Sequence, residues 1–207
     1  MTQSKIDKIN SDIEEQKIYE RKKFLGVGSS EAIAQYFNDI AEKDNLAKSG
    51  GDFIPASQIV CTSVIVPNRT LNQYQSYFEA FDLNVKHGPK DLVLVLCINL
   101  ARAAEVVGEL RGLNLNEGVM PLFSTKEDDA ETDHERKHLE SPLSVAVTTP
   151  KRAKFLSKLK ILDLNRVHRL VLDTSHFDFK NDIVLDIKAA VQLSSQVASN
   201  GGLIYLY

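Results

Sequence analysis

The sequence predicts an α/β protein with a mostly parallel sheet, and two observations carry that prediction. First, residues 92–97 read LVLVLC, a continuous apolar run of the kind that forms a strand buried on both faces of a sheet. Second, further short apolar segments follow at 119–123, 143–148, 170–173 and 203–206, and helical patterns separate them. Such alternation is typical of βαβ units, in which successive strands run parallel.

Residues 1–52 are predicted to form a helical extension that precedes the sheet domain. Isoleucines recur at helical spacing among mixed charges in residues 1–25, which indicates a helix with a narrow apolar stripe. The sequence GVGSS at 26–30 ends this helix, and its serines can cap the next one. The Gly-containing loop at 48–52 marks the boundary, so we assign residues 53–207 to one α/β domain.

Residues 53–81 are expected to contain helices only. An apolar helical stretch opens at Phe53 and continues through Ile65, Pro67 stops it, and Thr70 begins another helix. Within the sheet domain we expect helices at 101–113, 126–139, 150–159 and 183–198. The third of these has Pro150 at its first position, where a proline is well tolerated.

Composition indicates an ordinary globular chain. The 207 residues are 43% apolar and 26% charged, and the formal net charge of −3 excludes a wholly basic nucleic-acid-binding coat. Cys61 and Cys97 lie far apart in apolar settings, which favours a reducing compartment. The longest apolar run, 92–98, is too short to cross a bilayer, and the opening residues hold no apolar signal segment. We therefore expect a soluble protein of the cell interior with no membrane partner.

Residues 134–138 match the zinc-hydrolase pattern H-E-x-x-H. The pattern places His134 and His138 one helical turn apart, with Glu135 between them as a base. The neighbouring residues are mostly acidic, Pro142 ends the helix, and no third ligand is evident. We therefore expect a solvated helix and no bound metal.

A phosphate-binding loop is not found in the sequence. Such a loop needs Gly-Lys followed by Ser or Thr, and none of the ten glycines is followed by Lys-Ser or Lys-Thr. The glycines at 26 and 28 follow a polar helix rather than a strand, so they do not form a dinucleotide-binding motif either. We expect no nucleotide, no other cofactor and no catalytic residue; a nucleotide hydrolase would need an unrecognised phosphate loop.

Charge is segregated in the second half of the chain. Residues 151–169 contain seven Lys and Arg against one Asp, whereas residues 126–140 contain seven acidic residues against three basic ones. This segregation predicts one positive surface able to meet phosphates. A solvated helix with ordinary charge statistics explains the same pattern equally well.

Three segments in chain order resemble the first RecA-like domain of DEAD-box RNA helicases. The strand at 92–97 and the helix after it resemble A-L-V-L-x-P-T-R-E-L-A, the sequence TPKR at 149–152 resembles T-P-G-R, and LVLD at 170–173 resembles the start of V-L-D-E-A-D. Thr174 stands where those helicases have the Glu that positions the attacking water. The phosphate loop and a second RecA-like domain are missing as well, and a helicase needs both.

This combination is similar to the Cms-one family of small-subunit (90S) pre-ribosome proteins, which are shortened and catalytically silent helicase-like domains. The similarity runs from about Phe53 to the C-terminus and includes 53–56, 122–124 and the closing Leu206-Tyr207. Family members commonly carry a Lys-rich N-terminal tail, of which only the RKK sequence at 21–23 gives a hint here.

The resemblance implies a single RecA-like (P-loop-NTPase-like) three-layer domain and a non-enzymatic factor of early ribosome biogenesis in the nucleus and nucleolus. Its partners would be pre-ribosomal RNA, assembly proteins or both. Thr149 and Arg152 match helicase positions that grip RNA phosphates, and Lys151, Lys154 and Lys158 extend the positive surface. Alternatively, Thr149 only caps the helix and the protein is a protein-binding module without RNA affinity.

Overall fold

The computed structural model describes residues 3–46, 53–61, 69–83, 91–113, 118–124, 129–140 and 145–207. Within these ranges six strands form one sheet in the order β1-β6-β5-β2-β4-β3, and every neighbouring pair is parallel. The strands are β1 (Ile59–Val60), β2 (Leu92–Leu96), β3 (Val119–Leu122), β4 (Val145–Thr148), β5 (Val167–Leu172) and β6 (Leu203–Leu206). The predicted α/β class and parallel sheet are confirmed.

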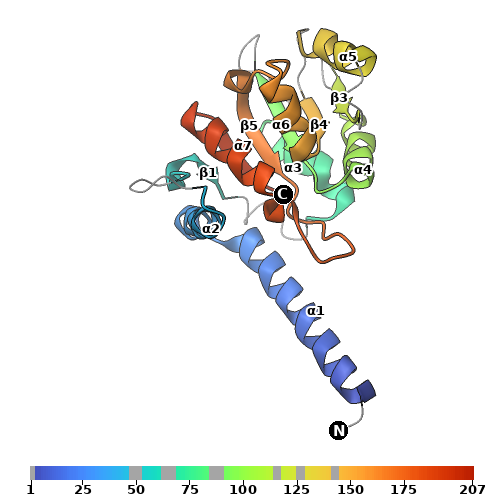
Figure 1. Ribbon diagram of the computed structural model, residues 1–207, viewed down its shortest axis with the longest axis vertical. Coiled ribbons are helices and arrows are strands. Elements are labelled where there is room, and N and C mark those ends of the chain that lie inside the picture. Colours follow the sequence, from blue (N-terminus) through green and yellow to red (C-terminus); the bar gives the residue numbers. More distant parts are fainter. Residues whose placement is uncertain are drawn as a thin grey trace.

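Helices cover both faces of the sheet, which gives the three layers of a RecA-like domain (Figure 1). They are α1 (Gln3–Val27), α2 (Ser30–Lys43), α3 (Tyr74–Ala80), α4 (Leu100–Leu110), α5 (Asp129–Glu140), α6 (Pro150–Lys158) and α7 (Lys188–Ser199). Alternate residues of β2 point to opposite faces: Leu94 belongs to the core that includes residues of α2, α6 and α7, whereas Val95 belongs to the core that includes residues of α3 and α4. Both faces of this central strand are therefore buried.

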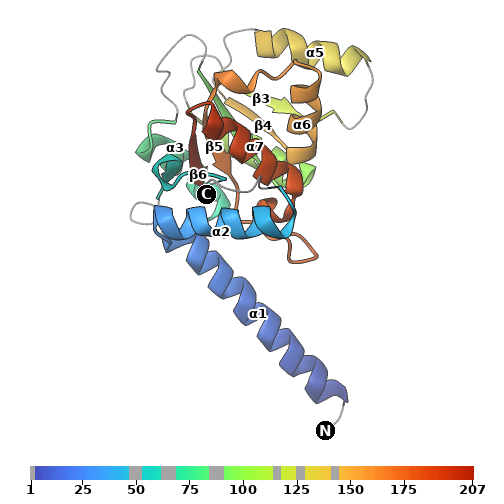
Figure 2. The same ribbon diagram turned by 60° about the vertical axis from the view of Figure 1, so that its left-hand side comes forward.

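The helix α1 projects from the sheet domain, and its N-terminal end lies farthest from it (Figures 1 and 2). Its last turns contact the domain, where Leu25 is buried in the same core as the sheet. A Cβ on Gly28 would lie 2.9 Å from the carbonyl oxygen of Phe24, so only glycine fits the corner between α1 and α2 without a shift. None of the helices in the described ranges has the length and apolar character needed to span a membrane.

The second helix packs Ile33 and Phe37 into the core beneath α7 and β1. The predicted helices at the N-terminus are confirmed, and α2 shares one apolar core with the sheet. The division of the chain at residue 52 stays a prediction, and the loop at 48–52 lies outside the described residues.

The expectation of helices alone in residues 53–81 is wrong. A single 3₁₀ turn, Ala56–Gln58, leads directly into β1, where Ile59 pairs with Ile204 and Val60 with Tyr205 at the edge of the sheet. These β-branched residues gain a strand partner that local pattern cannot reveal. Ile65 and Pro67 lie outside the described residues, and from Thr70 onward the predicted helix is confirmed as a 3₁₀ turn followed by α3.

Candidate functional site

The carboxyl ends of the parallel strands meet at one edge of the sheet. After β2, the amide of Cys97 donates to the carbonyl of Thr148 at 2.9 Å, and after β5 the amide of Asp173 donates to the carbonyl of Leu96 at 3.0 Å. The amide of Tyr207, after β6, donates to Leu172 at 2.9 Å. Because ligands of open α/β sheets bind outside this edge, it is the first place to expect a functional site.

The N-terminus of α6 lies at this edge because β4 ends immediately before it. Pro150 occupies the first helical position as predicted, and Thr149 is the N-cap residue. The hydroxyl oxygen of Thr149 accepts a long hydrogen bond, 3.5 Å, from the amide of Arg152. The capping role that the sequence allows for Thr149 is therefore present in the structure.

The three candidate lysines gather on the side of α6 that faces α7. Lys151, Lys154 and Lys158 line one groove of about 380 Å³, and Lys188 of α7 also lines it, although its ammonium donates to the carbonyl of Asp44 at 2.9 Å. Lys154 is half-buried and donates to the side-chain oxygen of Gln192. Lys151 and Lys158, on either side of it, are exposed. The spacing of three and four residues thus produces one positive stripe.

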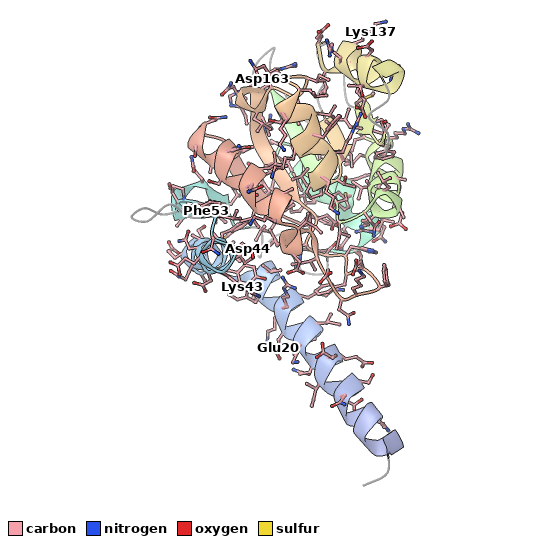
Figure 3. All side chains as sticks on the ribbon, in the orientation of Figure 1. Glu20, Lys43, Asp44, Phe53, Lys137 and Asp163 are labelled. Atoms are coloured by element: carbon pink, nitrogen blue, oxygen red, sulfur yellow. The ribbon has the colours of Figure 1, made fainter. Side chains whose placement is uncertain are left out.

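A second groove of about 450 Å³ continues the first toward α2. Lys154 and Lys158 belong to both grooves, and Leu46 and Phe53 add apolar surface to the second. Phe53, labelled in Figure 3, is held to α2 because its amide donates to the side-chain oxygen of Asn38 at 3.0 Å. We call the combined surface the α6–α7 groove. It is cationic along α6 and partly apolar toward α2.

Arg152 lies away from this groove although it belongs to the same helix. Its side chain is only 7% exposed, and its guanidinium pairs with the Glu135 carboxylate of α5, with a distance of 3.2 Å from Nε to Oε2. A second contact reaches the hydroxyl of Thr132 at 3.4 Å. The basic residue matched to an RNA-gripping position is thus in a buried ion pair that joins α5 to α6.

The helix α5 has one buried face, so the expectation of a fully solvated helix is wrong. Thr132, Glu135 and Leu139 are buried on one side of the helix. Burying the Glu135 carboxylate would be costly without a partner, and the Arg152 guanidinium supplies that partner. His134 and His138 lie on the exposed side with their Nε2 atoms 3.2 Å apart. Glu135 is turned to the other side, and the described residues contain no group of three side chains arranged to hold a metal.

Asp173 is fully buried and has a set of internal partners. One oxygen accepts from Arg102 Nε at 2.6 Å, and the other accepts from the Ser175 hydroxyl at 2.6 Å and, more weakly, from the Ser175 amide at 3.3 Å. Burial lowers the pKa of a guanidinium, but the Asp173 carboxylate outweighs that effect and raises the pKa of Arg102. The aspartate caps the turn after β5 and holds α4 against it.

Thr174, which the sequence resemblance aligns with the catalytic Glu of helicases, is buried as well. Its hydroxyl donates to the carbonyl of Tyr207 at 2.9 Å and accepts from Arg69 Nη1 at 2.8 Å. The Tyr207 ring packs 3.9 Å from the ring of Tyr74, measured between centroids. Tyr207 is thereby fixed to the end of β5. Arg69 carries no signal in the sequence, since it belongs to no recognised motif.

One family model matches most of this chain. Residues 8–197 match the model of the family described as CMS1, U3-containing 90S pre-ribosomal complex subunit. Neither the curated proteins nor the solved structures contain a match. The matched span includes α6 and the residues that line the α6–α7 groove, and it ends before β6. The chain belongs to the CMS1 family.

Proposed function

We propose that this protein is a non-catalytic subunit of the 90S pre-ribosome that binds pre-ribosomal RNA through the α6–α7 groove, in the nucleus and nucleolus. The family description supports the assembly and the compartment. The observation that carries the RNA contact is the lining of the smaller groove, where, among the described residues, four of seven are lysines and none is acidic. Lysines in this arrangement suit the phosphates of an RNA backbone.

Each site residue has a distinct part in this proposal. Lys151, Lys154 and Lys158 contact phosphates, while Thr149 fixes the start of α6, where the helix dipole favours anions. Arg152 acts indirectly, because its pair with Glu135 holds α6 in place. Contacts of this kind position a protein on RNA without reading its sequence, so the binding is weak and sequence-tolerant.

The pseudo-helicase character of the domain is part of the same proposal. A nucleotide-hydrolysing relative would use the residues after β5 for magnesium and water. Here the Asp173 carboxylate faces Arg102 and Ser175, and the Thr174 hydroxyl faces Arg69 and Tyr207. Both groups serve the protein's own structure, which supports a non-enzymatic role.

Single-stranded RNA binding at several salt concentrations tests the proposal. Four or five phosphate contacts give a log–log salt slope of about −3, at roughly 0.7 per contact. The triple variant Lys151→Ala/Lys154→Ala/Lys158→Ala should flatten that slope by about two. The control Lys8→Ala/Lys17→Ala/Lys137→Ala removes the same charge from exposed positions, and Lys137 lies at the end of the molecule opposite α1 (Figure 3).

A second candidate function rests on the apolar residues of the groove. Leu46, Phe53, Phe155 and Ile187 lie beside the lysines, a combination that also fits an acidic amphipathic helix of an assembly protein. If the triple variant, its control and the parent have the same RNA affinity and salt slope, the result contradicts RNA binding in the α6–α7 groove and favours this alternative.

A further inference from the structure

A second cationic cavity lies between α1 and the carboxyl edge of the sheet. It has a volume of about 480 Å³ and is separate from the α6–α7 groove, with which it shares no lining residue. Its basic lining residues are Lys22 and Lys23 of α1, Arg69, Arg102 and His176. In the part of the chain that the structure describes, no acidic side chain lines it. We call this cavity the α1 cleft.

The positive charges of the α1 cleft are only partly balanced by the protein. Arg102 has Asp173 and Glu105 as partners. Arg69 is buried, and among the described residues its guanidinium donates to neutral oxygens: the Thr174 hydroxyl at 2.8 Å and the carbonyls of Lys22 at 2.7 Å and Leu25 at 3.5 Å. Within the described ranges no carboxylate forms an ion pair with Arg69, Lys22 or Lys23.

The pKa of Lys22 reflects this excess of positive charge. Its ammonium lies 5.0 Å from the centroid of the Phe177 ring, and the residue lines the cleft together with two arginines. Burial first, and then the charges of Arg69 and Arg102, lower the pKa of Lys22. An anion in the cleft would relieve this repulsion and would give Arg69 a negatively charged partner.

We propose that the α1 cleft binds a phosphate group, held between the lysines of α1 and Arg69. A phosphate fits better than a single carboxylate because it offers several acceptor oxygens and up to two negative charges to cations that converge from different directions. The inference goes beyond the proposed RNA contact on α6, since it places a second anion site on residues that the α6–α7 groove does not contain. The phosphate can come from an RNA backbone or from a small molecule.

The test uses full-length protein and two probes, inorganic pyrophosphate and a single-stranded RNA oligonucleotide, at low salt. The variant is Lys22→Gln/Lys23→Gln, which leaves the buried arginines in place. Its control is Lys8→Gln/Lys17→Gln, which removes the same charge from the exposed part of the same helix. We expect the cleft variant to bind one or both probes at least about tenfold more weakly than the control, as the loss of charge-assisted hydrogen bonds implies.

The two probes separate the sources of the phosphate. Weakened binding of pyrophosphate alone identifies a small phosphate compound, and weakened binding of RNA identifies a backbone phosphate. Equal binding of both probes by variant and control, or no binding of either probe by the parent, would overturn the proposal. The triple α6 lysine variant should keep its pyrophosphate affinity, so a failure of the α6 contact is distinguishable from a failure of the α1 cleft.

Discussion

The N-terminal turns of α4 and α6 are built alike and differ in what surrounds them. Each has a polar N-cap, Asn99 or Thr149, and each carries a buried arginine at its third position, Arg102 or Arg152. In α4 the arginine pairs with Asp173 at the end of a neighbouring strand, whereas in α6 it pairs with a carboxylate of another helix.

The comparison shows that arginines and lysines have separate tasks at this edge of the sheet. Both arginines turn inward and hold elements together, because a planar guanidinium can satisfy a buried carboxylate through several hydrogen bonds. Around α6 the accessible charge comes from lysines, which reach solvent and form the positive stripe. A count of basic residues in the sequence therefore overstates the positive surface.

Removing the buried carboxylate that pairs with the α4 arginine is expected to have the largest effect. Asp173→Ala leaves Arg102 buried without its main partner, and breaking a buried pair in this way costs about 3–5 kcal/mol of unfolding free energy. Urea denaturation measures the change. Glu105→Ala is the control, since this carboxylate pairs with the same arginine from an exposed position and should cost less than about 1 kcal/mol. A loss under about 1 kcal/mol for Asp173→Ala would show that the pair is not the anchor of α4.

Removing the carboxylate that pairs with the α6 arginine should lower the free energy of unfolding somewhat less. Glu135→Ala removes the carboxylate partner of the Arg152 guanidinium, which keeps its contact with the Thr132 hydroxyl, so we expect a loss of about 3 kcal/mol. The matched control is Asp133→Ala on the same helix, whose contact with Arg136 is exposed and 3.9 Å long. Equal stability of the two variants in urea would mean that α5 is held by its apolar residues alone.

The sequence predicts the layers of this fold better than its charge pairs. The run at 92–97 and the segments that follow it specify buried strands by composition alone, and the turn after Asp173 has the short polar residues that such turns need. The pair of Arg152 with Glu135 could not be foreseen, because the polar character of α5 conceals the face that it buries. The two-residue β1 and the position of Arg69 depend on distant partners that leave no local pattern.

Alkaline pH should weaken the region around α4 more than that around α6. Burial, and then the nearby Asp173 carboxylate, raise the pKa of Tyr207, which follows β6, and of Tyr74, the first residue of α3. In the unfolded chain these phenols ionise near a pH of about 10, while in the folded state they stay neutral. The stability that this difference contributes is complete below about pH 10 and is lost as the pH rises from there toward the higher folded pKa values.

Chemical denaturation between about pH 8 and pH 11 checks this expectation. We predict that the free energy of unfolding falls by about 1–2 kcal/mol per buried tyrosine, because one pKa unit corresponds to about 1.4 kcal/mol. Tyr207→Phe should make the alkaline decline shallower, and Tyr19→Phe, at a residue that is 59% exposed, should leave it unchanged. A pH profile identical in the two variants would show that Tyr207 does not carry the effect.

Removing the N-caps of α4 and α6 should have the smallest effect on stability, and it allows a direct comparison of the two helices. The Asn99 side chain accepts from the amide of Arg102 at 2.9 Å, whereas Thr149 accepts from the amide of Arg152 at 3.5 Å. Replacing a cap with Ala costs roughly 0.5–2 kcal/mol, so we expect about 1 kcal/mol for Asn99→Ala and about half of that for Thr149→Ala. Thr149→Ser keeps the hydroxyl and should restore the stability of α6. A cost for Thr149→Ala as large as that for Asn99→Ala would show that the longer bond caps its helix equally well.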